Sequence, residues 1–497
     1  MNIVNLFIEA AKEYPHNKAI IEKNKFISYQ SLAEEVQKTA LYFTDQGIKK
    51  GDRVLVFVPM GIDLYRIVLA LFYIGATAVF LDEWVGKKRL EQCCRLADCK
   101  GFIGVLKARI FSWFSKELRQ IPIKLSLKNM KSGNLIPMEL EQETPALITF
   151  TTGSTGTPKA ALRSHGFLKE QFDALLNEIE PNENDIDMPV LPIVLFVNLG
   201  VGCTSVIADF KMTKVESLDA SKILSQISSE KVNRITASPF FVKKLAKETS
   251  KENLDFPSLK KIFTGGAPVF PNEAKMYENA FPNAKSTIVY GSTEAEPISS
   301  ILTDQLIEKE TQLELGLPVG ETYSRVELKI IGITENGIVL NDSSELSDLE
   351  LSNGSVGEII VAGHHVLKTY FNNEEAFREN KIVVGDTIWH RTGDSGYLKD
   401  NELYLTGRCK QLIWRKGQFI SPFIMENKLA NLEGVSSGTV MDFKNKIILV
   451  VESVMTQANL KEILNEFNYD ELKILKKIPK DPRHNSKIDY EKLKTFL

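Results

Sequence analysis

The sequence contains few cysteines, and they follow none of the patterns in which cysteines pair or bind metals. The five are Cys93, Cys94, Cys99, Cys203 and Cys409, and they form no repeated CxxC motif. A disulfide scaffold and a cysteine zinc site are therefore excluded as models for this 497-residue chain. We expect a reduced protein of the cytoplasm.

The chain also lacks an excess of charge of one sign. It has 61 Lys and Arg against 64 Asp and Glu, a net charge of −3. Because proteins that bind nucleic acid present a basic surface, we expect no nucleic-acid partner. The composition, 43% hydrophobic and 25% charged, is that of a globular protein, and the length predicts at least two domains.

No hydrophobic run has both the length and the continuity of a transmembrane helix. Residues 67–81 carry no charge but are too few to span a bilayer. Residues 188–208 are numerous enough, but two prolines, two glycines and Asn198 interrupt them. We expect no transmembrane segment, and the second run predicts a buried wall or an acyl-lining segment. The first 15 residues carry charges in an amphipathic pattern, which predicts a folded helix and no signal peptide.

Short apolar runs alternate with helical patterns from residue 17 to about 300. They include VLVFVP (54–59), TAVFLD (77–82), ALITFT (146–151) and STIVYG (286–291). This alternation predicts an α/β fold of parallel, helix-covered sheets. From about residue 316, short strand patterns predict a small barrel-like β subdomain, with a polar loop at 343–355. We expect an N-terminal domain at 1–408 and a small α+β C-terminal domain at 409–497.

Residues 149–161, TFTTGSTGTPKAA, form the most informative segment. Glycines let backbone N–H groups turn toward one anion, and hydroxyls and a lysine add donors and positive charge, which suits a polyphosphate. The spacing excludes a P-loop, which needs four residues between its glycines and Gly-Lys-Ser/Thr at a helix start. A polar surface loop is the alternative. The predicted ligand-binding residues are Thr151, Thr152, Gly153, Ser154, Thr155, Gly156, Thr157 and Lys159.

Two further motifs directly follow predicted strands. The first is Gly265, Gly266, Ala267 and Pro268, which offers free backbone donors, and the second is Tyr290, Gly291, Ser292, Thr293 and Glu294. The aromatic ring offers a stacking face for a base, the threonine a hydroxyl for a phosphate or carboxylate, and the glutamate a hard oxygen ligand for Mg²⁺. Each motif alone is also compatible with a simple turn.

Three later features carry single functional groups. Asp394, at the end of RTGD, can accept both hydroxyls of a ribose, and Arg408, at the end of TGR, can bind a phosphate or ribose oxygen. Lys487, in DPRHNSKID, can deliver a cation to a site built elsewhere. Taken singly, a structural Gly-Asp turn and a solvated surface lysine are the alternatives.

Taken together and in this order, the motifs resemble those of the adenylate-forming superfamily of acyl-CoA synthetases, adenylation domains and luciferases. The resemblance covers nearly the whole chain. The segments LDEWVGKKRLEQCC, FIGVLKA, LPIVLFVNLGVG and DPRHNSKID resemble the bacterial branch that holds fatty-acyl AMP ligases and olefin β-lactone synthetases.

The resemblance implies that ATP and a carboxylic acid form acyl-AMP and pyrophosphate, after which a thiol of CoA or of a phosphopantetheine acyl carrier protein accepts the acyl group. It also implies roles for single residues. The 151–159 loop would hold the β- and γ-phosphates, Thr293 would contact the α-phosphate, and Glu294 would bind Mg²⁺. Tyr290 would stack on adenine beside Gly266 and Ala267, and Asp394 and Arg408 would hold the ribose. Lys487 would bridge the carboxylate and the α-phosphate, and Lys410 would be the hinge of a mobile C-terminal domain.

The acyl pocket is expected between residues 191–201 and the strand ends before Gly265 and Tyr290. Its predicted substrate-binding residues are Leu195, Phe196, Asn198 and Gly265, and an ordinary buried strand is the alternative for the apolar run. Trp414 stands where the superfamily often has lysine, and Ser486 where it usually has glycine. The acceptor therefore stays open between a thiol, a β-hydroxyl that closes a β-lactone, and none at all in a catalytically inactive nucleotide-binding protein.

Overall fold

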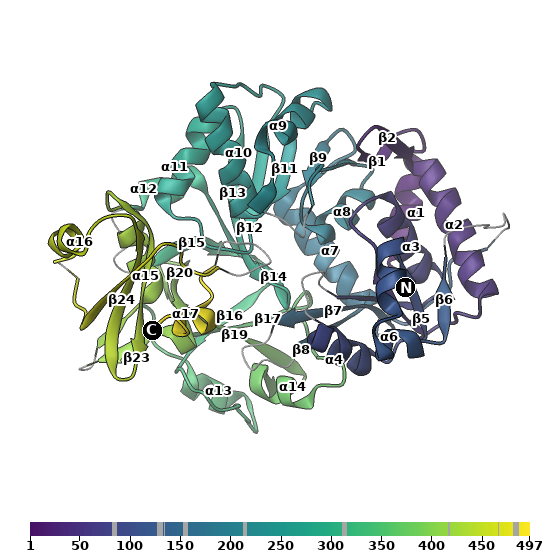
Figure 1. Ribbon diagram of the computed structural model, residues 1–497. Coiled ribbons are helices and arrows are strands. Elements are labelled where there is room, and N and C mark those ends of the chain that lie inside the picture. Colours follow the sequence, from purple (N-terminus) through teal and green to yellow (C-terminus); the bar gives the residue numbers. More distant parts are fainter. Residues whose placement is uncertain are drawn as a thin grey trace.

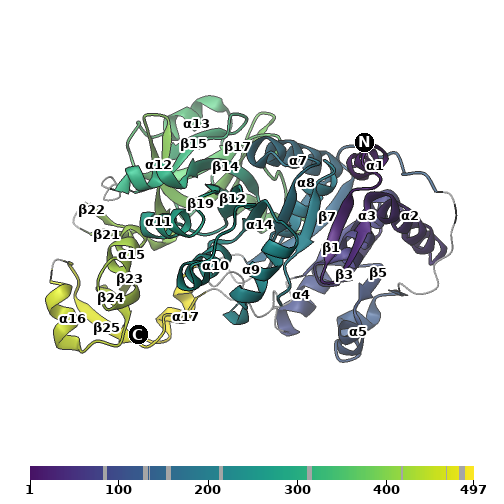
Figure 2. The ribbon, with the colours of Figure 1, turned by 90° about the horizontal axis from the view of Figure 1, so that it is seen from above.

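The computed structural model describes residues 1–81, 87–126, 133, 135–152, 158–211, 216–310, 316–415, 418–465, 467–480 and 487–497. Two large sheets and their helices make up most of the molecule, and a smaller unit at the C-terminus lies at one end (Figure 1). In the view from above, this smaller unit again lies at the end opposite α1 and α2 (Figure 2). The prediction of an α/β fold is confirmed.

The six-stranded sheet has the order β6-β5-β3-β4-β7-β8, parallel except for the antiparallel pair β7 and β8. Its strands are β3 (Arg53–Phe57), β4 (Thr77–Phe80), β5 (Gly101–Gly104), β6 (Ile123–Leu125), β7 (Pro145–Thr152) and β8 (Pro158–Ser164). The predicted phosphate loop connects β7 to β8. Its residues 153–157 lie outside the described part of the chain.

The 14-stranded sheet has a parallel half and an antiparallel half. The parallel half contains β1 (Lys18–Glu22), β9 (Ile186–Pro189), β10 (Thr204–Ile207), β11 (Arg234–Ala237), β12 (Lys261–Gly265) and β13 (Lys285–Ser292), with β2 (Lys25–Ser28) antiparallel at its edge. The antiparallel half contains β14 (Ala295–Leu302), β15 (Leu317–Thr322), β16 (Glu327–Ile331), β17 (Gly357–Ala362), β18 (Lys381–Val384), β19 (Thr387–Lys399) and β20 (Glu402–Arg408). The predicted β subdomain is thus hydrogen-bonded to the parallel strands through β13 and β14.

Helices cover these sheets, and α7 contacts strands of both. They are α1 (Val4–Glu13), α2 (Tyr29–Asp45), α3 (Ile62–Tyr73), α4 (Lys87–Ala97), α5 (Leu106–Ser112), α6 (Lys116–Gln120), α7 (His165–Ile179), α8 (Pro192–Leu199), α9 (Ala220–Ser229), α10 (Pro239–Glu252), α11 (Pro271–Ala280), α12 (Thr303–Glu308), α13 (Ser343–Leu349) and α14 (Glu374–Asn380). The ordinary buried strand, which was the alternative for the apolar run at 191–201, is wrong, because the run forms α8, which Pro192 begins. The loop predicted at 343–355 is wrong in its first half, which forms α13, capped by Asp342.

The C-terminal unit follows β20 and the short 3-10 helix Cys409–Gln411. It contains two small sheets and apolar clusters of its own. Its elements are β21 (Ile413–Arg415), β22 (Gln418–Ile420), α15 (Pro422–Ala430), β23 (Val435–Phe443), β24 (Lys446–Ser453), α16 (Gln457–Ile463), β25 (Glu471–Leu475) and α17 (Tyr490–Lys494).

Two further observations concern the cysteines and the apolar runs. None of the five cysteines is joined in a disulfide. Among the described residues, no helix combines the length and the apolar character needed to cross a membrane.

Candidate functional site

The carboxyl ends of β12 and β13 bring two of the predicted motifs together. The strands are parallel neighbours, with Gly265 paired to Val289. A side chain at position 265 would place its Cβ 2.5 Å from the carbonyl oxygen of Val289, so only glycine fits. At Gly266 φ is +82°, and an added Cβ would meet no atom within 4 Å. Open space therefore lies at the strand end beside Tyr290, where the sequence predicts the edge of a base.

Tyr290, Asp394 and Arg408 form a three-way contact between β13 and the β19–β20 pair. The Tyr290 hydroxyl donates to Oδ2 of Asp394 at 2.8 Å, and Nε of Arg408 lies 3.0 Å from Oδ1 of the same carboxylate. Asp394 and Arg408 are paired residues in the β19–β20 register. Burial and the neighbouring Asp394 raise the pKa of Tyr290 well above its usual value, so its hydroxyl stays a donor. The structure thus brings together three side chains that the sequence predicted separately.

The turn after Tyr290 is held by hydrogen bonds of its own. Oγ of Ser292 accepts from the backbone N–H groups of Glu294 and Ala295, each at 3.2 Å. These bonds fix the backbone that carries Thr293 and Glu294, the two predicted catalytic residues of this motif. Gly291 is required here, since an added Cβ would lie 2.9 Å from the carbonyl oxygen of Ala295.

Arg163 is a site residue that the sequence did not reveal. One of its terminal nitrogens donates to the carbonyl oxygen of Thr293 at 3.0 Å, and the other donates to Oγ1 of Thr149 at 2.8 Å. It thereby joins the YGSTE turn to β7, which leads into the predicted phosphate loop. No short motif surrounds Arg163, so only the fold shows this connection.

Two buried lysines approach one tyrosine near Glu294. Lys159 is 9% exposed and donates to Oδ1 of Asn380 at 2.9 Å. Its Nζ lies 6.0 Å from the ring centre of Tyr370, and Nζ of Lys381, which is 2% exposed, lies 5.6 Å from the same centre. The Tyr370 hydroxyl donates to Oε1 of Glu294 at 3.3 Å. Only Lys159 and Glu294 of these five were predicted from motifs.

The lysine cluster carries positive charge that burial makes unfavourable. Burial lowers the pKa of Lys381 to about 7, with nearby Lys159 adding to the effect and Glu294 opposing it. Burial also lowers the pKa of Lys159, again against the influence of Glu294. Because a bound anion would favour the charged lysines, the cluster suits a ligand that carries several negative charges.

The rest of the predicted phosphate site is only partly described. Gly153, Ser154, Thr155, Gly156 and Thr157 lie outside the described residues. The backbones of Thr151 and Thr152 pair with those of Lys159 and Pro158 across β7 and β8. Lys159 therefore lies across from the last described residues before the loop.

The two predicted C-terminal lysines are both exposed. Lys410 lies in the 3-10 helix Cys409–Gln411, and its charge contributes to lowering the pKa of Lys159. Lys487 lies directly before Ile488, which forms an isolated bridge with Lys480. The hinge role of Lys410 and the catalytic role of Lys487 stay predictions.

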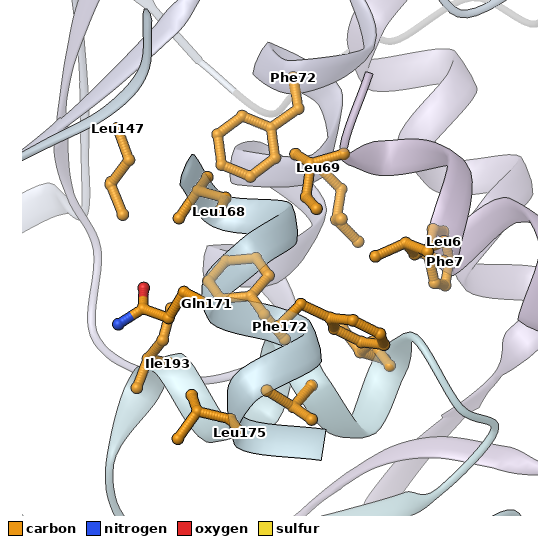
Figure 3. A pocket seen from close by; sticks show the side chains of 14 residues that line it. Leu6, Phe7, Leu69, Phe72, Leu147, Leu168, Gln171, Phe172, Leu175 and Ile193 are labelled. Atoms are coloured by element: carbon orange, nitrogen blue, oxygen red, sulfur yellow. The ribbon is translucent and has the colours of Figure 1, made fainter. Parts of the chain in front are cut away.

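An apolar cavity lies among α1, α3, α7 and α8 (Figure 3). Part of the run 191–201, predicted as one wall of the acyl pocket, lines it, but the strand ends before Gly265 and Tyr290, predicted as the other wall, do not. The side chains of Ile193, Phe196 and Val197 line it from α8. Gln171, on α7, is its single polar lining residue, and Oε1 of Gln171 is buried with no hydrogen-bond partner in the described structure. At about 40 Å³ the cavity holds about three water molecules, so a long acyl chain requires its side chains to move.

Leu195, Asn198 and Gly265 are not among the residues that line this cavity, and their substrate-binding role stays a prediction. Leu195 is fully buried in the core. The Asn198 amide donates to Oδ2 of Asp187 at 2.8 Å and to Oγ of Ser205 at 3.1 Å. It therefore anchors α8 to β9 and β10. A helix turns successive residues to different faces, so only part of the apolar run can face the cavity.

Comparison with known proteins shows the family to which the chain belongs. A family model described as AMP-binding enzyme matches residues 7–371. An olefin beta-lactone synthetase of Xanthomonas campestris is 28% identical over 408 residues, which are 77% of this chain and 72% of that protein. An olefin beta-lactone synthetase of Stenotrophomonas maltophilia is 26% identical over 94% of this chain and 90% of its own. Other relatives are named acyl-CoA or 4-coumarate–CoA ligases.

Solved structures share the fold at lower sequence identity. ATP-bound MatB from Rhodopseudomonas palustris superimposes with a TM-score of 0.83 and is 19% identical, covering 100% of this chain and 99% of that one. The two large sheets and the C-terminal unit described above are thus an arrangement that other proteins also adopt.

Proposed function

Since the chain belongs to the AMP-binding enzyme family, we propose that it uses ATP to activate a carboxylic acid as acyl-AMP, with release of pyrophosphate. The observation that carries this proposal is the contact among Tyr290, Asp394 and Arg408 beside the open space at Gly266. A ring, a carboxylate and a guanidinium in mutual contact suit a base and a ribose. The lysine cluster near Glu294 suits the phosphates.

The proposed reaction brings two anions together. A carboxylate oxygen of the acid attacks the α-phosphorus in line with the bond to the β-phosphate. That P–O bond breaks, and its electron pair leaves with pyrophosphate, so no proton transfer is needed. The residues must hold both anions in position and offset their repulsion, the usual requirements of phosphoryl-type transfer.

The residues divide these tasks in the following way. Lys159 and Lys381 supply positive charge around the β- and γ-phosphates, and the Thr293 hydroxyl binds the α-phosphate. Glu294 would hold Mg²⁺, which neutralises phosphate charge when bound, and a single carboxylate is a sufficient protein ligand because the phosphates supply others. Lys487 would bridge the carboxylate and the α-phosphate, and Lys410 would be the hinge that brings it there.

We propose that the acid is hydrophobic and that the cavity at α8 receives part of its chain. Phe196 and the apolar side chains around it favour a hydrocarbon over a charged group. The acyl group would then pass to CoA or to a carrier-protein thiol in the cytoplasm.

A second candidate ends in a β-lactone. It is favoured by two relatives named olefin beta-lactone synthetase, which the chain matches over most of its length. Here the oxygen of the β-hydroxyl attacks the carbonyl carbon of its own acyl-AMP and closes a four-membered ring. The bond from that carbon to AMP breaks, AMP leaves, and the hydroxyl proton passes to solvent, so no thiol is needed. A catalytically inactive nucleotide-binding protein is the remaining alternative, and intact Lys159, Glu294, Asp394, Arg408 and Lys487 argue against it.

A screen of pyrophosphate release separates these possibilities. Straight-chain acids of graded length and 3-hydroxy acids are supplied with ATP and Mg²⁺, with and without CoA, and the products are identified by mass spectrometry. Acyl-CoA formed only with CoA supports the thiol ligase, whereas a CoA-independent product lighter than the hydroxy acid by one water supports the β-lactone route. No pyrophosphate from any acid would overturn the proposal.

A further inference from the structure

Three side chains of the C-terminal unit meet in a hydrogen-bonded triangle. The hydroxyl of Tyr490, the first residue of α17, donates to Oε1 of Glu426 on α15 at 2.7 Å. Oγ1 of Thr439 on β23 lies 2.6 Å from the Tyr490 hydroxyl and 3.1 Å from the same carboxylate oxygen. The triangle thus joins α17, near the end of the chain, to α15 and β23, whose contacting residues lie 64 and 51 positions earlier.

Tyr490, one member of the triangle, lies three residues after Lys487. The two residues between them are also held in place by backbone contacts. Ile488 pairs with Lys480 in an isolated bridge. The backbone N–H of Asp489 donates to the carbonyl oxygen of Pro479 at 3.0 Å, and its side chain caps α17. Ile488 and Tyr490 also pack against the apolar cluster formed by Met441, Ile448, Val450, Ile478 and Leu493.

Helix α15, which carries Glu426, contacts the part of the molecule formed by the two large sheets. The hydroxyl of Ser421, which caps α15, donates to the carbonyl oxygen of Thr406 on β20 at 2.5 Å. The ring of Phe423 lies 5.2 Å from that of Phe270, centre to centre. Through α15, the segment that begins at Lys487 is therefore connected to the strand that ends in Arg408.

We propose that the triangle of Glu426, Thr439 and Tyr490 is a positioning device that sets the place of Lys487 for adenylation, an inference that rests on the proposed function. None of the three side chains needs to touch the substrates. They act on the backbone segment that carries Lys487. Because the lysine side chain is long and flexible, its amine reaches one fixed position only if this backbone is itself fixed. A small displacement of a reacting group has a large kinetic effect, up to about 100-fold for 1 Å.

The triangle needs an acceptor at position 426 more than it needs a charge there. Burial raises the pKa of Glu426 to about 7, although the hydrogen bonds from Tyr490 and Thr439 and the charge of Lys480 act in the opposite direction. The protonated form of the carboxyl is therefore far more populated near neutral pH than it is for an ordinary glutamate. Glutamine at this position retains an oxygen acceptor, whereas leucine removes it.

The test is acid-dependent ATP–pyrophosphate exchange by the full chain, with the acid that gives the strongest pyrophosphate release in the screen. We expect Tyr490→Phe and Glu426→Leu to lower kcat about tenfold, with the KM for ATP unchanged. Glu426→Gln is expected to retain most of the activity. Tyr469→Phe, which removes a hydroxyl elsewhere in the same unit, is the matched control and should behave like the wild type.

A double-variant cycle separates positioning from a general loss of structure. If the triangle acts through Lys487, Tyr490→Phe adds nothing further to Lys487→Ala, because the group that it positions is already gone. Hydrogen exchange of the amides at 487–491 should be faster in Tyr490→Phe, which gives a readout independent of activity. Thr439→Val supplies a second variant should Tyr490→Phe fail to fold.

The outcomes distinguish the two levels of the proposal. Normal exchange by Tyr490→Phe, or losses that multiply in the double variant, would overturn the positioning role while Lys487 keeps its own. Normal exchange by Lys487→Ala would overturn the proposed role of the lysine and the positioning device with it.

Discussion

The nucleotide side of the candidate site and its acyl side are built in different ways. On the nucleotide side, charged and polar side chains pair with one another, as in the Tyr290–Asp394–Arg408 contact. On the acyl side, the described lining is apolar except for Gln171, whose Oε1 has no hydrogen-bond partner among the described residues. The first region is specified by directional contacts, and the second by shape.

This difference determines what a substitution should do in each region. Removing one atom of a hydrogen bond or an ion pair abolishes that interaction. The remaining polar group is then partly buried without a partner, which costs free energy. An apolar wall tolerates exchange of one hydrocarbon for another, and its effect on a ligand depends on volume. We therefore expect large, general effects on the nucleotide side and smaller, chain-length-dependent effects on the acyl side.

The largest effect is expected for Asp394→Ala. The substitution removes the acceptor of both Tyr290 and Arg408 as well as the predicted ribose ligand. We expect kcat/KM for ATP in pyrophosphate exchange to fall about 100-fold, since hydrogen bonds to charged groups contribute about 1.5–3 kcal/mol each. Steady-state exchange at varied ATP measures this. Asp400→Ala, in the exposed turn of the same hairpin, is the control. An unchanged KM and kcat in Asp394→Ala would show that directional contacts do not specify the nucleotide side, and the contrast with the acyl side would fail.

A smaller effect, on the binding of polyphosphate and the proton uptake that accompanies it, is expected for Lys381→Met. The folded protein holds the pKa of Lys381 at about 7, below its usual 10.5, so between these values it binds fewer protons than the unfolded chain. The contribution of Lys381 to the free energy of unfolding therefore rises with pH across this window. A bound polyphosphate should raise the pKa of Lys381 again, so that binding takes up protons near pH 8.

Calorimetry in buffers of different ionisation enthalpy measures that proton uptake with pyrophosphate as the ligand. We expect Lys381→Met to take up fewer protons than the wild type and to bind pyrophosphate about tenfold more weakly. Lys368→Met, an exposed lysine on a neighbouring segment, is the control. Equal uptake by Lys381→Met and the wild type would place the buried cation outside the phosphate site.

The nucleotide side was also the part that the sequence predicted best. Tyr290, Asp394 and Arg408 stand in short motifs, and the structure brings their side chains into contact. The motif after β12 identified Gly266, where the structure has open space. Asp394 and Arg408 are partners on adjacent strands, whereas β14 and β15 separate β20 from the β13 of Tyr290, so the fold is needed to show that the three meet.

The remaining site residues could not be found in this way. Arg163, Tyr370, Asn380 and Lys381 belong to no motif, and the function of each depends on what the fold places next to it. The acyl side shows the same limit from another direction. An apolar run does not reveal which of its residues face a cavity, and helix α8 turns Asn198 away from the one found here.

The smallest effect, and the most selective, is expected for Gly200→Ala on the acyl side. The added methyl would lie 2.4 Å from the ring of Phe172, a lining residue of the cavity, so the ring must move. At φ −78° the backbone of Gly200 itself accepts alanine. Because the cavity is only about 40 Å³, we expect the ratio of kcat/KM for long and short acids to change a few-fold.

The KM for ATP should stay constant in Gly200→Ala, since the substitution is on the acyl side only. Gly332→Ala is the matched control, because a methyl added there meets no atom within 4 Å. Pyrophosphate release with acids of graded length measures the ratio. A uniform loss of activity at every chain length would mean that Phe172 has only a structural role. A change confined to the longer acids would mean that this cavity binds the acyl chain and sets the preferred chain length.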